Sequence, residues 1–233
     1  MIKYVEVAKK LEEYIIDKDL KQGQKLPVFS ELLKTYSVSK STLVKAFEIL
    51  EKRGIIYQIQ GSGTFVRRPE RNGFINLLDN NGLTGDFEES KKTSKILKLE
   101  VVNALPEIQS LFNCGDEDFY HLVRLRYSDG KPLLYEDTYY RKSVVPHIDK
   151  EIALGSMFKY IHNLGFHISF SNKYLKVGKL DQKHADELNL PVDSPALLMN
   201  EVYYLSSGVP FNYSTLTYNY QNSKFFVQSN TFN

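Results

Sequence analysis

Apolar residues recur at helical spacing through the first part of the chain. Intervals of three and four positions predict an amphipathic helix with one buried face, formed by Val5, Ala8, Leu11 and Ile15. Gly23 and the Leu26-Pro27 pair end that pattern, because proline fixes its φ angle and favours a first helical turn. A second short helix is therefore expected from about Pro27 to Tyr36.

A third helix is predicted from about Lys40 to Arg53. Ser39 is suited to cap it, because its hydroxyl can accept a hydrogen bond from an amide two or three residues further on. The positions i, i+3, i+4 and i+7 form an apolar face made of Leu43, Ala46, Phe47 and Leu50. The opposite face then presents Lys40, Ser41, Val44, Lys45 and Glu48.

The pattern changes to that of strands after Gly54. Residues 55–60 alternate, Gly61-Ser62-Gly63 permits a tight turn with positive φ, and Thr64-Phe65-Val66 is typical of a returning strand. Three helices followed by a hairpin predict a winged helix-turn-helix. In that fold the third helix enters the major groove of DNA and the hairpin tip reaches flanking backbone or the minor groove.

The residues predicted to contact DNA follow from this arrangement. They are Ser39, Lys40, Ser41, Thr42, Val44 and Lys45 on the third helix, and Gly61, Ser62, Gly63 and Thr64 in the hairpin. Residues 1–68 carry 13 Lys and Arg against 8 Asp and Glu, or +5, and the rest of the chain carries 17 against 20, or −3. The basic end suits a polyanion such as double-stranded DNA. A winged helix used only for protein contacts is the alternative.

The region from residue 69 to 92 is dense in Asn, Gly, Asp and Glu, which is typical of a linker. Within it, residues 74–78 are apolar enough to dock as a short strand or turn. We therefore predict a DNA-binding domain over residues 1–68, a linker over 69–92 and a second domain over 93–233.

The remainder of the chain is rich in strand patterns. Strands are predicted at Ile96 to Val102, His121 to Tyr127, Leu133 to Tyr140, Ile168 to Val177, Ala196 to Leu205 and Phe211 to Tyr220. Helices are predicted at Leu105 to Phe112, Ser156 to Asn163 and Gln182 to Leu188. Asp129-Gly130 and Ser207-Gly208 are typical of hairpin turns. The expected class is α+β, with an antiparallel sheet covered by helices.

The first half resembles the GntR family of bacterial regulators. The match runs from Gly23 to Val66 and rests on the Gly before Leu26-Pro27, Glu31-Leu32, Val38-Ser39, Thr42, Ala46, Leu50, Gly54 and the turn Gly61-x-Gly63-Thr64-Phe65-Val66. Family members usually have Ser-Glu-Arg where this chain has Val28-Phe29-Ser30, and Arg where it has Lys40 and Val44. Lys40 keeps the charge but lacks the planar fork that contacts guanine through two hydrogen bonds.

The second half resembles the sensor domain of the HutC branch of that family, the UTRA type, whose fold is shared with chorismate lyase. The resemblance rests on the hairpin from Val123 to Leu133, Tyr135-Glu136-Asp137, Tyr139, Val145-Pro146, Ser156-Met157-Phe158, Leu164-Gly165 and the hairpin from Gly208 to Phe211. It implies a homodimeric regulator, expected to be a repressor, whose small effector alters the spacing of two DNA-binding heads.

Two arginines and a glutamate are the candidate effector-binding residues. Arg124 and Arg126 are two positions apart on a predicted strand, so they point to the same face, and Glu136 on the paired strand can lie near them. Guanidiniums bind phosphate or carboxylate through two hydrogen bonds, and a carboxylate can accept from a ligand hydroxyl or amine. The resemblance adds Ser94 and Tyr218 and favours a sugar phosphate. An Arg/Glu ion pair on a solvated sheet face is the alternative.

Other site chemistries have little support in the sequence. The five histidines are not at metal-binding spacing, Cys114 is the single cysteine, and neither a metal nor a cofactor is predicted. No apolar run is long enough to span a membrane, so a cytoplasmic protein is expected. The alternative to a regulator is an enzyme with lyase-like chemistry in the second domain, since an Arg-rich pocket with a carboxylate could bind and cleave a carboxylated substrate. A regulator with a vestigial pocket is a third.

Overall fold

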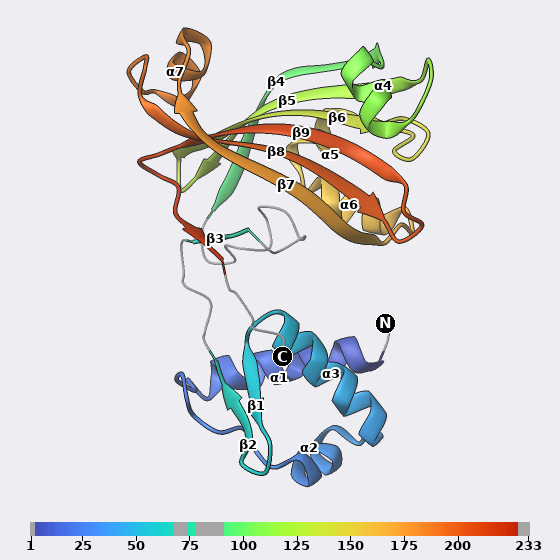
Figure 1. The fold of residues 1–233 in the computed structure, drawn as a ribbon, viewed down its shortest axis with the longest axis vertical. Coiled ribbons are helices and arrows are strands. Elements are labelled where there is room, and N and C mark those ends of the chain that lie inside the picture. Colours follow the sequence, from blue (N-terminus) through green and yellow to red (C-terminus); the bar gives the residue numbers. More distant parts are fainter. Residues whose placement is uncertain (1–2, 68–73, 78–90, 228–233) are drawn as a thin grey trace. The chain divides into compact units, whose positions relative to one another are not determined.

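The computed structural model describes residues 3–67, 74–77 and 91–227, which group into two compact units (Figure 1). One unit contains residues 3–67 and the other contains residues 74–77 and 91–227. Most of the predicted linker over 69–92 lies outside the described residues, as does the chain end over 228–233. The boundaries at 68/69 and 92/93 therefore stay predictions.

The first unit is a three-helix bundle with a hairpin. Its elements are α1 (Lys3–Asp17), α2 (Phe29–Tyr36), α3 (Lys40–Lys52), β1 (Ile56–Ile59) and β2 (Gly63–Val66). All four predicted apolar residues of α3 are buried in its core. Arg53, directly after α3, forms a double hydrogen bond with Glu12 of α1 at 2.7 and 2.8 Å. The predicted winged helix-turn-helix is confirmed.

One predicted core position of α1 is wrong. Val5 is 40% exposed, and Val7 is buried together with Ala8, Leu11 and Ile15. A helix turns about 100° per residue, so Val5 and Leu11, which are six positions apart, point in directions about 120° apart. Val7 is one helical turn before Leu11 and therefore shares its face.

The second unit is built on a six-stranded antiparallel sheet. Its helices are α4 (Pro106–Phe112), α5 (Lys150–Leu154), α6 (Met157–Asn163) and α7 (Gln182–Leu188). The strands of the sheet are β4 (Lys92–Asn103), β5 (Asp118–Ser128), β6 (Lys131–Arg141), β7 (Ile168–Lys179), β8 (Pro195–Leu205) and β9 (Pro210–Asn219), in the order β4-β5-β6-β9-β8-β7. The two short strands β3 (Ile75–Asn76) and β10 (Phe225–Phe226) pair in parallel. The predicted α+β class is confirmed, and α5 is an element that the sequence did not predict.

Hairpin turns join the strands that carry the candidate site residues. Asp129 and Gly130 both have positive φ, at 50° and 76°, which is the geometry of a two-residue turn between β5 and β6. The turn by itself would set Arg124 opposite Tyr135, but a register shift between Arg126 and Tyr127 sets it directly opposite Glu136. Gly208, with φ of 81°, lies in the turn between β8 and β9.

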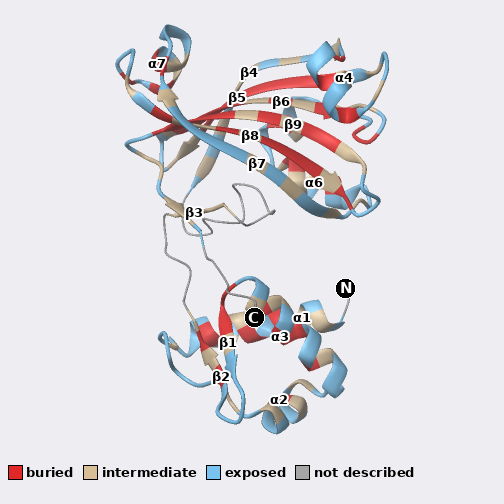
Figure 2. Ribbon diagram, in the orientation of Figure 1, coloured by how far each residue is buried: buried red, intermediate tan, exposed pale blue. Residues whose placement is uncertain are grey.

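The two faces of the sheet carry different helices. Helices α5 and α6 pack on the face that includes Leu122, Tyr140 and Tyr203. Helix α7 packs on the other face, against Val123, Leu125 and Tyr135, and α4 packs on Phe119. Figure 2 shows the inner strands β5, β6 and β9 largely buried, whereas the edge strand β7 is largely exposed. Arg124 projects from the face that carries α5 and α6.

Candidate DNA-binding and effector-binding sites

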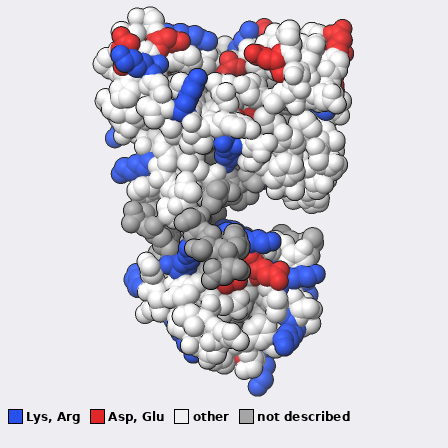
Figure 3. Space-filling model, in the orientation of Figure 1, with Lys and Arg blue, Asp and Glu red and all other residues white. Residues whose placement is uncertain are grey.

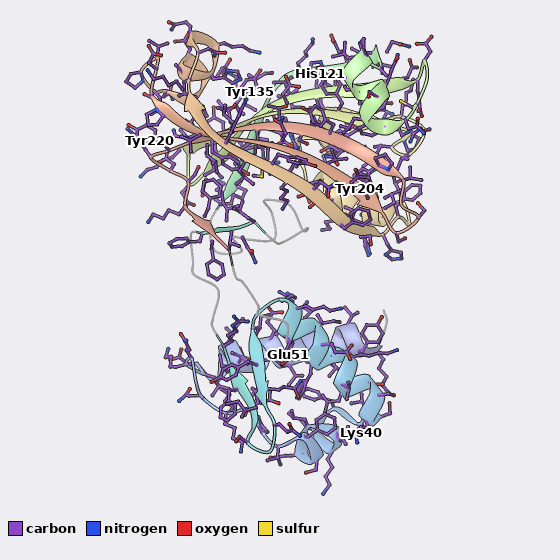
Figure 4. The ribbon with its side chains drawn as sticks, in the orientation of Figure 1. Lys40, Glu51, His121, Tyr135, Tyr204 and Tyr220 are labelled. Carbon is purple, nitrogen blue, oxygen red and sulfur yellow. The ribbon has the colours of Figure 1, made fainter. Side chains whose placement is uncertain are left out.

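The N-terminal turn of α3 presents the predicted DNA-contacting side chains to solvent. Ser39 caps the helix, since its side chain accepts a hydrogen bond from the Thr42 amide at 3.3 Å. The exposed members of the predicted set are Ser39, Lys40, Ser41, Val44 and Lys45, and Thr42 is half-buried. Figure 4 labels Lys40 at the start of this helix. Figure 3 shows basic side chains on the visible surface of the first unit. This helix end is accessible and carries two cations.

The hairpin between β1 and β2 has the tip that the sequence predicts, with one exception. Gly61 and Gly63 have φ of 76° and 118°, a region that glycine adopts without strain. Gly61, Ser62 and Gly63 are exposed, but Thr64 is only 9% exposed because it lies on the same inward face of β2 as the buried Val66. Contact between the Thr64 side chain and DNA therefore has little support from its burial.

The hairpin also brings in a cation that the sequence analysis did not select. The segment around Lys25 bridges β2, with hydrogen bonds from the Leu26 amide to Thr64 and from the Val66 amide to Gln24. The exposed Lys25 side chain runs along Gly63, where a Cβ atom would lie 2.6 Å from Lys25 Cε. Only this long-range bridge, absent from any local pattern, places Lys25 at the wing.

The structure explains one of the residues that depart from the family pattern around the start of α2, namely Phe29. Phe29, half-buried, packs edge-to-face on Phe47 of α3 with ring centroids 5.7 Å apart. An aromatic pair of this kind adds roughly 0.5–1.5 kcal/mol beyond the area that it buries. Phe29 therefore contributes to the packing of α2 on α3.

The predicted effector residues form one buried cluster in the second unit. Arg124 donates from Nε and Nη2 to the two carboxylate oxygens of Glu136 at 3.1 and 2.8 Å, and Arg126 donates to Glu136 at 3.3 Å. Arg124 is 1% exposed, and the other two are each 8% exposed. The three groups converge as expected. The ion pair is buried, however, and not solvated as in the alternative reading of the sequence.

Arg124 also holds the end of α5. Its Nη1 donates to the carbonyl oxygens of Ala153 at 2.6 Å and Gly155 at 3.3 Å. These carbonyls come at the C-terminus of the helix, where main-chain acceptors have no helical partner. Arg124 therefore has a structural role in addition to any ligand contact, whereas the described contacts of Arg126 run to Glu136.

The cluster carries more positive than negative charge. Within the described part of the chain, Glu136 is the only carboxylate within 4 Å of either guanidinium. Burial raises the pKa of the Glu136 carboxyl, but the two arginines outweigh that effect and hold its pKa below the usual value. Burial, with the like charge of Arg124, lowers the pKa of Arg126 despite the pull of Glu136. One buried positive charge lacks a compensating carboxylate, which favours an anion beside it.

Ser94 and Tyr218 lie in the same row across the sheet as Arg126. The register pairs Ser94 with Arg126, Arg126 with Leu134, and Leu134 with Tyr218. Directly opposite residues on neighbouring strands project to the same face, so both lie on the face that carries the cluster. Ser94 is half-buried and Tyr218 is buried.

A buried polar group continues from the cluster across the sheet, and the sequence analysis did not identify it. Its members share the face of Glu136 and are each at most 8% exposed: Thr138, Asn212, Ser214 and Glu201. Thr138 donates to Ser214 at 2.9 Å, and Asn212 donates to Ser214 at 3.1 Å. Strand alternation placed these residues on the face, but only the sheet order put three strands side by side.

Comparison with known proteins bears on both sites. The family model for bacterial regulatory proteins of the gntR family matches residues 3–66, and the UTRA domain model matches residues 89–222. The HTH-type transcriptional regulator YydK of Bacillus subtilis is 44% identical over 100% of this chain and 99% of its own. The chain belongs to the GntR family, with a UTRA domain.

Two further matches agree with this assignment. The crystal structure of YydK covers 99% of this chain and all of its own, with a TM-score of 0.87 at 43% identity. The mannosyl-D-glycerate transport/metabolism system repressor MngR of Escherichia coli is 26% identical over 95% of this chain and 93% of its own. This GntR-family protein is therefore a transcription regulator and not an enzyme, so the lyase reading is not supported.

Regulators of this family bind operator DNA, and their UTRA domain binds a small-molecule effector. None of the described helices is both long and apolar enough to cross a membrane. Which residues of this chain contact DNA or effector stays a prediction.

Proposed function

We propose that this regulator is a dimeric repressor whose operator affinity is controlled by a small anionic effector, with a sugar phosphate as the favoured class. The single observation that carries the effector class is the buried cluster in which Arg124 and Arg126 share the Glu136 carboxylate. A phosphate or carboxylate at the arginines would neutralise the remaining positive charge through hydrogen bonds to the guanidiniums. Glu136, Ser94 and Tyr218 would then contact the uncharged part of the ligand.

The name of one relative supports both the sign of regulation and the ligand class. MngR is named as a repressor of a system for mannosyl-D-glycerate, which is a sugar that carries a carboxylate. The proposal for this chain remains broader, because phosphate and carboxylate present similar oxygen acceptors to a guanidinium.

The effector proposal is tested by thermal unfolding in the presence of candidate anions. Glucose 6-phosphate, mannosyl-D-glycerate and inorganic phosphate are titrated against the full chain, because a ligand at 100 times its Kd stabilises the folded state by about 2.7 kcal/mol. Arg126→Met is expected to remove the stabilisation by any active compound. Arg141→Met is the matched control, since Arg141 is also an arginine of this sheet but pairs with Glu117. Equal ligand stabilisation of wild type and Arg126→Met would refute the site.

The DNA-binding proposal rests on the N-terminal turn of α3. Lys40→Ala and Lys45→Ala are each expected to weaken operator binding by about 1 kcal/mol or more, and to lower the salt slope by about one for each phosphate that the side chain neutralises. Lys52→Ala is the matched control, because Lys52 is also exposed but lies at the opposite end of the same helix. Operator affinity and salt slope that are unchanged in the double variant of Lys40 and Lys45 would show that α3 does not enter the groove.

The dimer proposal places a second copy against β7. A single winged helix covers one half-site, so a dimer on a pseudo-palindrome is expected. β7 is an edge strand with several exposed apolar residues, namely Phe170, Tyr174, Leu175 and Val177. Both edge strands carry three lysines, but Val101 is the one large apolar residue of β4 that is exposed, against four on β7.

Sedimentation of the full chain tests that interface. Val177, 79% exposed, is replaced by Lys, which is expected to turn the dimer into a monomer at micromolar concentration. Val101→Lys on β4 is the control, because Val101 is 46% exposed on the opposite edge. A dimer that persists in Val177→Lys would move the interface away from β7.

A further inference from the structure

The end of the linker packs on the sheet face that carries the arginine cluster. Ile75, 4% exposed, belongs to the same hydrophobic cluster as Leu134, Leu216 and Tyr218, and Leu77 packs against that cluster. Leu134 is directly opposite Arg126 and Leu216 is directly opposite Glu136. Residues in such rows share a face of the sheet, so the linker end lies beside the candidate effector site.

Backbone hydrogen bonds and one side chain hold this linker end in place. The Ile75 amide donates to the Lys224 carbonyl at 2.7 Å and the Leu77 amide donates to the Phe226 carbonyl at 3.0 Å, in the pairing of β3 with β10. From the far edge of the sheet, Lys173 of β7 donates from Nζ to the Leu77 carbonyl at 3.0 Å. A charged ammonium therefore has a neutral main-chain acceptor in the linker.

Lys173 is also connected to the buried polar face. It is directly opposite Glu201 on β8, and its ammonium lies 5.6 Å from the ring centroid of Tyr203. Glu201 is buried, and burial raises its pKa to about 7, with Lys173 acting to lower the pKa and Glu136 acting to raise it further. Glu201 thus responds electrostatically to both Lys173 and the arginine cluster.

Glu136 and Lys173 lie on the same face of the sheet, at opposite ends of the buried polar group. The order β6-β9-β8-β7 separates Glu136 from Lys173 by three strand spacings of about 4.8 Å each. A ligand anchored at the arginines would extend along Thr138 and Ser214 toward Lys173. The Lys173 ammonium has three N–H donors. A ligand oxygen that accepts from it would draw the side chain toward the arginine cluster and so lengthen its hydrogen bond to the Leu77 carbonyl.

We propose that Lys173 couples occupancy of the arginine cluster to the linker, by holding the Leu77 carbonyl in the free protein and releasing it when effector binds. This inference rests on the proposed effector site. Release of Leu77 would loosen the segment from Phe74 to Leu77, through which the chain continues toward the DNA-binding unit. Lys173 acts here as a positioning residue and not as part of the DNA interface.

The test uses the full chain without effector, so that it does not depend on knowing the ligand. Lys173→Met removes the ammonium, Lys173→Arg retains a cation, and Lys159→Met is the control for loss of an exposed lysine of the same unit. Hydrogen exchange is measured at the Ile75 and Leu77 amides and in β5. Operator affinity is measured with a fragment that the wild type selects from random-sequence DNA.

Lys173→Met is expected to speed exchange at Ile75 and Leu77 at least tenfold while exchange in β5 is unchanged. It should also weaken operator binding at least fivefold, in the range usual for allosteric coupling, because the variant imitates the effector-bound state. Lys173→Arg and Lys159→Met should both stay within twofold of the wild type in each measurement.

Three results would overturn the inference. They are unchanged exchange at Leu77, faster exchange with unchanged operator affinity, and faster exchange that extends equally to β5. Unchanged exchange would show that Lys173 does not hold Leu77 in place. Faster exchange with unchanged operator affinity would show that it holds Leu77 without coupling to DNA binding, and faster exchange in β5 as well would show a general loss of stability. A wild type that selects no DNA fragment would instead contradict the proposed function, so the two failures are distinguishable.

Discussion

The buried cluster predicts that its two arginines, although chemically alike, differ greatly in their contribution to stability. Arg124→Met would leave Glu136 with one hydrogen bond from Arg126 at 3.3 Å, because the single Thr138 hydroxyl hydrogen is donated to Ser214 at 2.9 Å. It would also strip the carbonyls of Ala153 and Gly155 of their donor. Breaking a buried ion pair by removal of one partner costs about 3–5 kcal/mol, and we expect that range for Arg124→Met.

Arg126→Met should behave differently, because it leaves the double hydrogen bond between Arg124 and Glu136 intact. It also removes a buried charge whose pKa is lowered by burial and by Arg124, so the folded state disfavours its charged form. The missing hydrogen bond and the relieved repulsion offset each other, and the expected change is within about 1 kcal/mol. Glu136→Gln should cost at least as much as Arg124→Met, since two buried guanidiniums then lack a carboxylate.

The measurement is the free energy of exchange of the slowest amides in β5 and β6, which report global opening of this unit without assuming that the whole chain unfolds in one step. Thermal unfolding gives a second reading, where 3–5 kcal/mol corresponds to a fall in Tm of roughly 10–20 °C. If Arg126→Met were as damaging as Arg124→Met, the reasoning from charge and from the α5 carbonyls would be refuted. If both cost under about 1 kcal/mol, the cluster would not be buried in solution.

Two further predictions concern a buried acid and the wing. The pKa of Glu201, about 7, lies above its usual value of 4.5, so the stability that protonation contributes is fully present below about pH 4.5 and is lost as the pH rises through 7. Glu201→Gln should therefore raise the unfolding free energy at pH 8 by up to about 3 kcal/mol and leave it unchanged near pH 4.5. Urea unfolding at both pH values measures this difference. A gain independent of pH would contradict this assignment. Gly63→Ala should destabilise the hairpin of β1 and β2 by about 1–3 kcal/mol and weaken operator binding, because φ is 118° and the new Cβ would meet Lys25. At Gly61 the new Cβ would have open space, so Gly61→Ala carries only the cost of its positive φ. Equal operator affinities for the two glycine variants would show that the contact with Lys25 is relieved freely.

Local patterns in the sequence determined most of the secondary structure and the shared face of the two arginines. The apolar spacing of α3 and the cap at Ser39 depend on residues within one or two turns, so they could be predicted before any tertiary contact was known. Arg124 and Glu136 are only partly of this kind. The Asp129-Gly130 turn predicts the hairpin, but by itself it would set Arg124 opposite Tyr135, and a register shift between Arg126 and Tyr127 sets it opposite Glu136 instead. Strand alternation then required Arg126 to share that face.

Tertiary structure decided what those residues contact and how strongly. The five-residue α5 has too few turns for a periodic pattern, yet its terminal carbonyls bind Arg124. Lys173 and Glu201 come near the cluster only through the order β6-β9-β8-β7, in which sequence neighbours are not all spatial neighbours. Helices and a linker end from distant parts of the chain bury the cluster. This burial turns what would be a solvated ion pair into a charged site with few hydrogen-bond partners. Desolvation is a property of everything packed around a group, which is why no local pattern could have revealed it.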